Sequence, residues 1–198
     1  MKTIKTIFLT LLSVILVLIT GCNKEDNEEK VSSYVGIYRI SNAILNEPLT
    51  LTTNEMGVLA IPQGTDITVM ISDALLSALS CTSTDNSRIE LREEGSLYMS
   101  CTGENNEINA GTWEESSENV LKLNLNSTAI PSSPTGISLE VTNVSWSGNT
   151  LGGNTSVPMA EEMFVEMVQL MSGGQASLNT DATPDVSFVN IAISFTKQ

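Results

Sequence analysis

Short runs of alternating hydrophobic and polar residues recur along most of the chain and predict β-strands. The alternation is clearest at 120–125, where leucines alternate with polar residues, and at 189–195, where every second residue is apolar. Such runs favour an all-β fold, an antiparallel barrel or a sandwich, and a barrel has the advantage of leaving no exposed sheet edge. The predicted strands span 34–40, 49–53, 57–61, 66–71, 88–91, 96–101, 111–114, 120–125, 138–145 and 186–196.

Two segments depart from this alternation and predict short helices. Ser72 and Asp73 form a cap for an apolar helix over 74–79, which we expect to cover one end of the sheet. A second helix, over about 158–172, is expected to open at Pro158 and close before Gly173. The apolar face of this helix is rich in methionine, a flexible side chain that adapts to varied ligands, so the face is a candidate pocket lining. The alternative is a helix that packs on the sheet to complete the core. This face comprises Met159, Met163, Phe164, Met167 and Met171.

The first residues follow the arrangement of a bacterial lipoprotein signal peptide. Lys2 and Lys5 precede an apolar run over 7–19 that is too short for a comfortable membrane span. The run ends in Leu-Ile-Thr-Gly-Cys, which resembles a lipobox, so we interpret 1–21 as a signal peptide and Cys22 as the lipidated N-terminus. Two or three acyl chains would anchor the protein stably to a membrane. The alternative is an ordinary cleaved signal followed by an incidental cysteine.

The residues after Cys22 are expected to form an acidic tether over 22–33. Asn-Lys-Glu-Asp-Asn-Glu-Glu follows the cysteine, and this run resembles the surface-export signal of Bacteroidetes-type lipoproteins. A charged linker also stays extended without any signalling role. Aspartate does not follow Cys22 directly, so the common inner-membrane retention pattern is not met. We therefore expect a lipid anchor in the outer membrane, at the cell surface.

Charge and composition narrow the classes of function. The chain carries 23 acidic and 9 basic residues, a net charge of −14, which argues against nucleic acid as a partner. It contains no histidine, which removes Ser-His-Asp and Cys-His catalysis and histidine-ligated zinc. Nothing in the sequence calls for a cofactor or a metal. A hydrolase based on two carboxylates stays open as the last-ranked class, because sequence cannot place two acids across a cleft.

Cys81 and Cys101 are the remaining cysteines of the mature chain and are expected to form a disulfide. Disulfides persist outside the cytoplasm, where the signal would send the protein. Closing a loop of this size would contribute about 3 kcal/mol in the chain-entropy picture. Two buried free thiols are the alternative, because cysteine is also a small core residue.

The segment around 89–125 resembles the core of lipocalin-like (calycin-type) domains in Bacteroidetes-type lipoproteins. It contains a strand, an acid-glycine turn at Glu94-Gly95, a second strand, and then Gly111-Thr112-Trp113 with a following hairpin partner. Gly36-Ile37-Tyr38 has the related small-x-aromatic form, with tyrosine where that family usually has tryptophan. The resemblance implies one lipocalin-like β-barrel domain over 34–198. The residues after Leu125 depart from a minimal barrel, which keeps a split barrel or two-sheet sandwich open.

Three classes of function follow from these features. The first is a non-enzymatic, lipid-anchored binding protein that holds a small apolar or glycan ligand inside the barrel or at its mouth. The second is an accessory surface lipoprotein that binds another outer-membrane protein in an uptake or adhesion assembly. The carboxylate-dependent hydrolase is the third.

Two surface features accompany these classes. Trp146 is a candidate contact for a protein partner or a sugar ring, with core packing as the alternative. Asn126 begins an Asn-x-Thr run, and Asn143 and Asn154 begin Asn-x-Ser runs; we interpret all three as turn-rich surface without inferring a glycan.

Overall fold

The computed structural model describes residues 31–76, 78–130, 135–182 and 186–198. The predicted signal peptide, Cys22 and most of the predicted tether lie outside these residues. Ser33–Gln198 form one compact unit, and the description that follows concerns this unit. No helix in the described ranges is long and apolar enough to cross a membrane.

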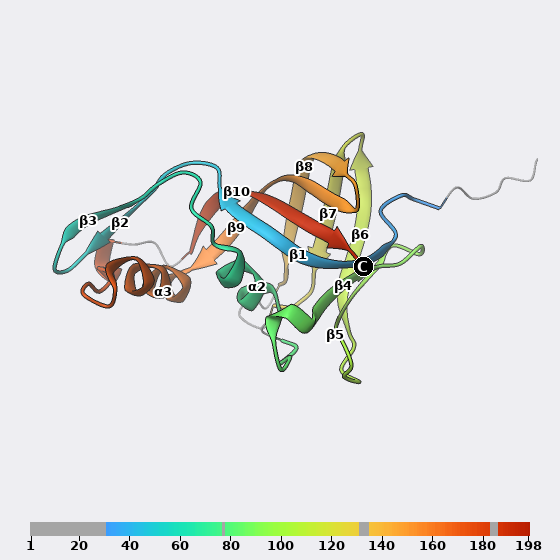
Figure 1. Ribbon diagram of the computed structural model, residues 1–198, viewed down its shortest axis with the longest axis horizontal. Coiled ribbons are helices and arrows are strands. Elements are labelled where there is room, and N and C mark those ends of the chain that lie inside the picture. Colours follow the sequence, from blue (N-terminus) through green and yellow to red (C-terminus); the bar gives the residue numbers. More distant parts are fainter. Residues whose placement is uncertain (1–30, 77, 131–134, 183–185) are drawn as a thin grey trace, which may run out of the picture. The chain divides into compact units, whose positions relative to one another are not determined.

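The unit is built on a closed antiparallel barrel of eight strands, in the order β1-β10-β9-β8-β7-β6-β5-β4 (Figure 1). Consecutive strands pair from β4 to β10, and β1 closes the barrel by pairing with both β10 and β4. The prediction of an all-β antiparallel barrel is therefore confirmed, and closure decides between the barrel and the sandwich. The barrel strands are β1 (Gly36–Leu45), β4 (Ser87–Leu91), β5 (Ser96–Cys101), β6 (Ile108–Ser117), β7 (Val120–Leu125), β8 (Ile137–Ser147), β9 (Thr150–Ala160) and β10 (Val186–Lys197).

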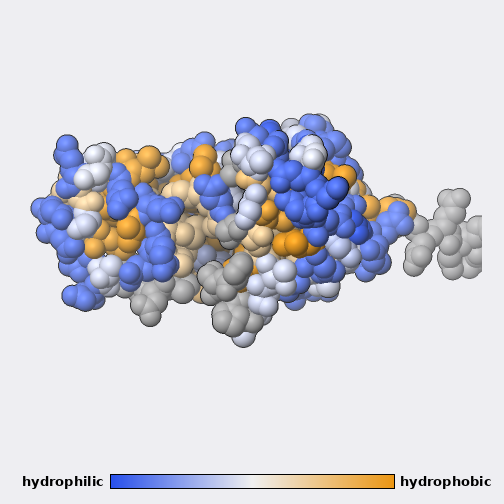
Figure 2. Space-filling model, turned by 90° about the horizontal axis from the view of Figure 1, so that it is seen from below, coloured by the Kyte–Doolittle hydropathy of each residue, from blue (hydrophilic) through white to orange (hydrophobic). Residues whose placement is uncertain are grey.

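Two insertions extend from the barrel. Between β1 and β4 the chain forms the hairpin β2 (Leu49–Thr53) and β3 (Gly57–Ile61), followed by the helix α2 (Thr68–Leu76) and a short 3-10 turn, Thr84–Asn86. Between β9 and β10 it forms the helix α3 (Glu161–Ser172) and a second 3-10 turn, Thr180–Ala182. Thr53 at the end of β2 bridges to Leu178, so the two insertions are in contact. Hydrophobic residues are exposed over the end of the unit that carries β2, β3 and α3 (Figure 2).

The predicted strand over 66–71 is wrong, because α2 begins there. Asp66 Oδ1 accepts hydrogen bonds from the backbone N–H and the hydroxyl of Thr68, at 2.8 and 2.6 Å, which caps the first turn. Ile71 of α2 is fully buried, and Ile67, which directly precedes the helix and lies four residues earlier, is buried as well, as expected for positions on one side of a helix. The β-branched residues in this run favoured a strand, and burial of this face outweighs that preference.

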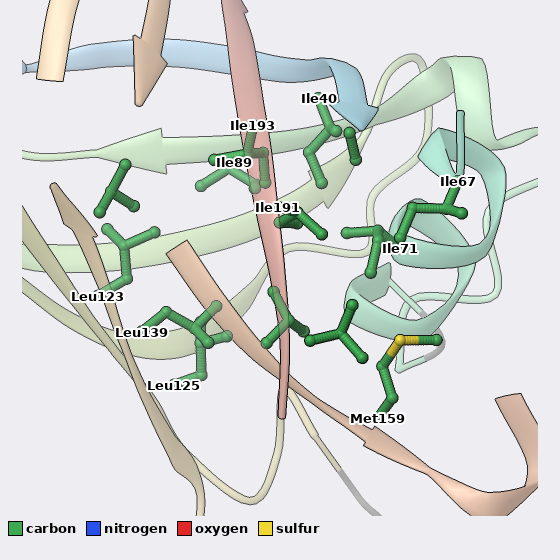
Figure 3. Close-up of a cluster of buried hydrophobic side chains, with 14 of the residues drawn as sticks. Ile40, Ile67, Ile71, Ile89, Leu123, Leu125, Leu139, Met159, Ile191 and Ile193 are labelled. Atoms are coloured by element: carbon green, nitrogen blue, oxygen red, sulfur yellow. The ribbon is translucent and has the colours of Figure 1, made fainter. Parts of the chain in front are cut away.

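The barrel interior and α2 share one hydrophobic core. Figure 3 shows Ile71 of α2 beside Ile191 of β10 and Ile67, just before the helix, on the far side of Ile71, with Ile89 and Leu123 further into the barrel. The first helix therefore covers one end of the barrel, as the sequence predicted, although it starts earlier and ends at Leu76.

The strand β9 was not predicted, and it includes the expected start of the second helix. Pro158 and Met159 belong to β9, where Pro158 pairs with Phe188, and α3 begins only at Glu161. Proline lacks an N–H donor, so it is tolerated where a strand is paired on one side. The predicted end of the helix is confirmed, since Gly173 adopts the left-handed conformation that terminates it, with φ of 62°.

The Gly-x-Trp run lies in β6, where each residue has a packing role. Gly111 has φ of 139°, and a Cβ atom there would overlap the backbone carbonyl of Asn124. The Trp113 indole is buried and donates from Nε1 to the carbonyl oxygen of Arg92 at 2.8 Å. Both residues stabilise the barrel wall, as expected of structural positions.

Candidate functional site

The barrel interior is filled by side chains. The cavity inside it measures about 10 Å³, which is close to the space that one water molecule needs. Its lining is apolar apart from Thr155, and the lining residues are Ile89, Leu97, Met99, Leu123, Leu125, Leu139, Val141, Thr155, Ile193 and Phe195. A lipocalin-type ligand would need several hundred cubic ångströms here, so the interior offers it no room.

The methionine-rich face contributes to packing around α3. Phe164 and Met167 of α3 are fully buried, as is Met159 of β9, and Met163 is partly buried against the same core. Met171 is 42% exposed at the end of the helix. None of these five residues lines the interior cavity. Their placement therefore matches the alternative of a helix that completes the core.

The barrel wall opens on its outer face where β8 and β9 diverge. The β8–β9 ladder of the described strands runs from Ser147↔Thr150 to Thr142↔Asn154, with a bulge in β8 between Thr142 and Ser145. The β9–β10 ladder continues much further, to Ala160↔Val186. We call the point at which Thr142 and Asn154 are paired the seam.

Gly153 permits the close approach of the two strands at the seam. A Cβ atom at this position would lie 2.6 Å from Val141 Cγ1 and 2.8 Å from the carbonyl oxygen of Thr142. The bulged residue Asn143 has φ of 53°, a conformation that asparagine tolerates better than most residues. A glycine opposite a bulge therefore sets where β8 turns away from β9.

A polar groove of about 360 Å³ lies at this divergence, and we call it the outer groove. It gathers side chains from β8, β9, β10 and the end of β1, and every one of them is polar. Its lining residues are Asn46, Glu140, Thr142, Asn154, Thr155, Ser156 and Asn190.

Hydrogen bonds fix several of the amides in the outer groove. Asn46 Nδ2 donates to Asn154 Oδ1 at 3.0 Å, and Asn190 Nδ2 donates to Glu47 Oε1 at 2.6 Å. The Asn46 backbone N–H donates to the carbonyl oxygen of Asn190 at 2.9 Å, which ties the end of β1 to β10. These contacts hold the amides in place before any ligand binds, which lowers the entropy cost of binding.

Thr155 is the polar residue shared by the groove and the interior cavity. Its side chain is only 6% exposed, and its hydroxyl has no hydrogen-bond partner within the described part of the chain. A buried hydroxyl without a partner is costly, by about 1–3 kcal/mol. Thr155 also lines the outer groove, close to the point where the β8–β9 ladder ends at Thr142↔Asn154, so its hydroxyl is a candidate partner for a group bound there.

The lining determines which ligands the groove suits. Asparagine amides and hydroxyls both donate and accept hydrogen bonds, which suits neutral groups such as hydroxyls. Glu140 is the charged residue of the lining, and the strongly acidic chain disfavours anions. Among the residues that the structure describes, no group of three or more acids or cysteines is placed to hold a metal ion.

Trp146 belongs to an aromatic cluster at the end of the barrel where the described chain begins. Its ring stacks on Tyr34 at 6.5 Å between centroids, contacts Tyr38 at 6.3 Å, and lies 5.7 Å from Lys197 Nζ. The Tyr38 hydroxyl donates to the carbonyl oxygen of Tyr34 at 2.6 Å, and burial raises the pKa of Tyr38 to about 12. Trp146 is still 38% exposed, so it combines packing with a partly accessible edge.

Cys81 and Cys101 form a disulfide, with Cα atoms 5.6 Å apart, as the sequence predicted. The bridge joins the loop after α2 to the end of β5. Asn106 reinforces this junction, since its Nδ2 donates to the carbonyl oxygen of Leu79 at 3.2 Å and its Oδ1 accepts from the Cys101 backbone N–H at 3.0 Å. The disulfide thus holds the covering helix against the barrel, apart from the outer groove.

The residues of the outer groove were not identified from the sequence as candidate site residues. Asn154 was interpreted as part of a turn-rich surface, yet it lies inside β9. The glycine pair before it produced that error, although glycine inside a strand also marks a bulge or a close approach of two backbones. Asn46 and Asn190 carried no distinguishing signal, because only the barrel register brings them together.

No protein-family model, curated protein or solved structure matches this chain.

Proposed function

We propose that this chain is a non-enzymatic binding protein that holds a neutral, hydroxyl-rich ligand of the glycan class in the outer groove. Lipidation of Cys22 would anchor it in the outer membrane at the cell surface, as the lipobox indicates. In this proposal the barrel serves as a rigid support and its interior holds no ligand.

The unpartnered hydroxyl of Thr155 carries the proposal. Thr155 is one of the lining residues of the outer groove, all of which are polar, and it lies next to amides already fixed by hydrogen bonds. A sugar hydroxyl supplies both a donor and an acceptor, which matches amides and hydroxyls that need one or the other. Of the two ligand classes expected from sequence, the apolar one loses support because the interior cavity is only about 10 Å³.

The test is binding of the full chain, kept in mild detergent, to a panel of neutral mono-, di- and trisaccharides and their acidic counterparts. Thr155→Val keeps the shape of the side chain and removes the hydroxyl. We expect it to weaken binding about tenfold or more, and to raise stability by about 1 kcal/mol because an unsatisfied buried hydroxyl is lost. Calorimetry measures the affinity and thermal unfolding the stability.

Thr50→Val is the matched control, because Thr50 is exposed on β2 and lies outside the groove lining. It should change neither affinity nor stability appreciably. Equal affinity of Thr155→Val and the unchanged chain would contradict the proposed site. Preference for acidic saccharides would contradict the electrostatic argument.

The second candidate is a protein-binding surface lipoprotein, and one observation favours it. Met56 and Val58 of the β2–β3 insertion are 56% and 66% exposed, and Leu170 of α3 is 73% exposed. Exposed apolar residues gathered over two elements are typical of a contact surface. A chain that binds no saccharide of the panel would favour this candidate over the glycan proposal.

A further inference from the structure

Phe188 of β10 is a large apolar residue that is exposed to solvent. It is 72% exposed, whereas Val189, Ile191, Ile193 and Phe195 of the same strand are buried in the barrel. The alternation along β10 puts Phe188 on the outer face, the face that carries the outer groove.

The register of β9 and β10 places this ring beside the groove. Asn190 pairs with Ser156, and both line the groove. The next outward-facing pair along the same two strands is Phe188 with Pro158. Two residues along a strand span about 7 Å, so a flat apolar pair directly continues the polar lining.

We propose that Phe188 and Pro158 form a second subsite, so that the ligand is a neutral saccharide of at least two rings that lies along β9 and β10. This inference rests on the proposed function, since it names the ligand that the groove would take. The hydroxyls of one sugar ring would form hydrogen bonds with the amides and with Thr155. The next sugar ring would stack with its C–H face against the Phe188 ring.

The chemistry of both partners supports this division. The face of an aromatic ring is negative and attracts the weakly positive C–H groups of a sugar ring. Pro158 adds apolar surface beside the ring and has no N–H that would need a partner. Phenylalanine carries no polar group of its own, so this subsite selects ring shape, while hydrogen bonds in the groove select the hydroxyl pattern.

The experiment measures the affinity of the full chain for a series of neutral mono-, di- and trisaccharides built from glucose, galactose, mannose, xylose and N-acetylglucosamine. In the unchanged chain, affinity should rise from one ring to two. Phe188→Ala should weaken disaccharide and trisaccharide binding about tenfold, the size of one aromatic contact, and leave monosaccharide binding unchanged. Phe188→Tyr keeps the ring and should restore the dependence on length.

Val58→Ala is the matched control, because Val58 is also exposed but lies on β3 and outside the groove lining. It should change no affinity. If Phe188→Ala keeps the full gain from one ring to two while Thr155→Val still weakens binding, the subsite is wrong and the proposed function stands. If the unchanged chain binds no saccharide at all, the proposed function fails and the subsite fails with it.

Discussion

The inner and outer faces of the wall formed by β8, β9 and β10 differ sharply in what they can hold. The inner face is apolar and packed around a cavity of about 10 Å³, whereas the outer face carries a groove of about 360 Å³ whose lining residues are all polar. Thr155 contributes to both. The difference indicates that a closed barrel need not carry its ligand inside, because a seam between diverging strands creates a concave surface elsewhere.

The largest effect is expected from a mutation that disrupts the packing of the inner face. Leu97 is fully buried and lines the interior cavity, so Leu97→Ala should destabilise the unit by about 3 kcal/mol and enlarge that cavity. An enlarged apolar cavity binds small apolar molecules, so benzene should raise the melting temperature of this variant but not that of the unchanged chain. Saccharide binding at the outer groove should persist below the melting transition.

Denaturant and thermal unfolding measure the change, with Val58→Ala as the control. Val58 is exposed, and its truncation should alter stability by less than about 0.5 kcal/mol. A loss below about 1 kcal/mol for Leu97→Ala would mean that the interior is loosely packed, and the contrast between the two faces would weaken.

A smaller effect is expected at the seam. Gly153→Ala would push a Cβ atom against Val141 and the carbonyl of Thr142, which should cost about 2 kcal/mol and shift β8 relative to β9. Because the groove depends on that geometry, saccharide affinity should fall as well. Unfolding experiments and calorimetry measure the two effects.

The neighbouring glycine offers a matched control for this change. A Cβ atom at Gly152 would lie 3.5 Å from Ser194 Oγ, which is an ordinary contact. Gly152→Ala should therefore leave stability within about 0.5 kcal/mol and affinity unchanged. Identical behaviour of the two alanine variants would show that close approach at the seam is unimportant.

The smallest effect is a response to acid that spares the interior. The Glu55 carboxylate accepts hydrogen bonds from the backbone N–H and hydroxyl of Ser177, at 2.7 and 2.8 Å, and these bonds lower the pKa of Glu55 below its ordinary 4.5. Because the pKa of Glu55 is lower in the folded protein, its bonds to Ser177 stabilise the fold fully above pH 4.5. This stabilisation is lost as the pH falls through the pKa that Glu55 has in the folded protein.

Hydrogen exchange follows this loss residue by residue. The protection factor of the Ser177 amide should fall in acid, while that of Ile193 inside the barrel should hold. Glu55→Gln should remove the pH dependence at Ser177. Equal loss of protection at Ile193 would mean that acid opens the barrel itself.

The regularity of the strands made much of the barrel predictable. The strands over 49–53, 57–61, 96–101 and 120–125 were predicted with both ends correct, because alternation with turn residues at each end defines a half-buried strand. Alternation failed at β9, where Gly152 and Gly153 interrupt it, and at α2, where β-branched residues form a helix. In both places a tertiary contact outweighs the local preference.

The candidate site was far less predictable than the fold. Its lining comes from four separate stretches of the chain, and no spacing in the sequence joins Asn46 to Asn154 or Asn190. Thr155 looks like any threonine until burial and the missing partner of its hydroxyl are known. A site made by strand divergence becomes visible only once the register is known.

The closure of the barrel through β1 also has a consequence for how the chain folds. Tyr38 of β1 pairs with Ile89 of β4 on one side and with Lys197 of β10 on the other, so the pairing of β1 is complete only after β10, the last strand, has formed. Contacts between residues so distant in sequence raise the contact order, and such β-proteins fold in about milliseconds to seconds. Until β10 is available, β1 and β9 each present an unpaired edge, and these edges are prone to aggregation during that interval.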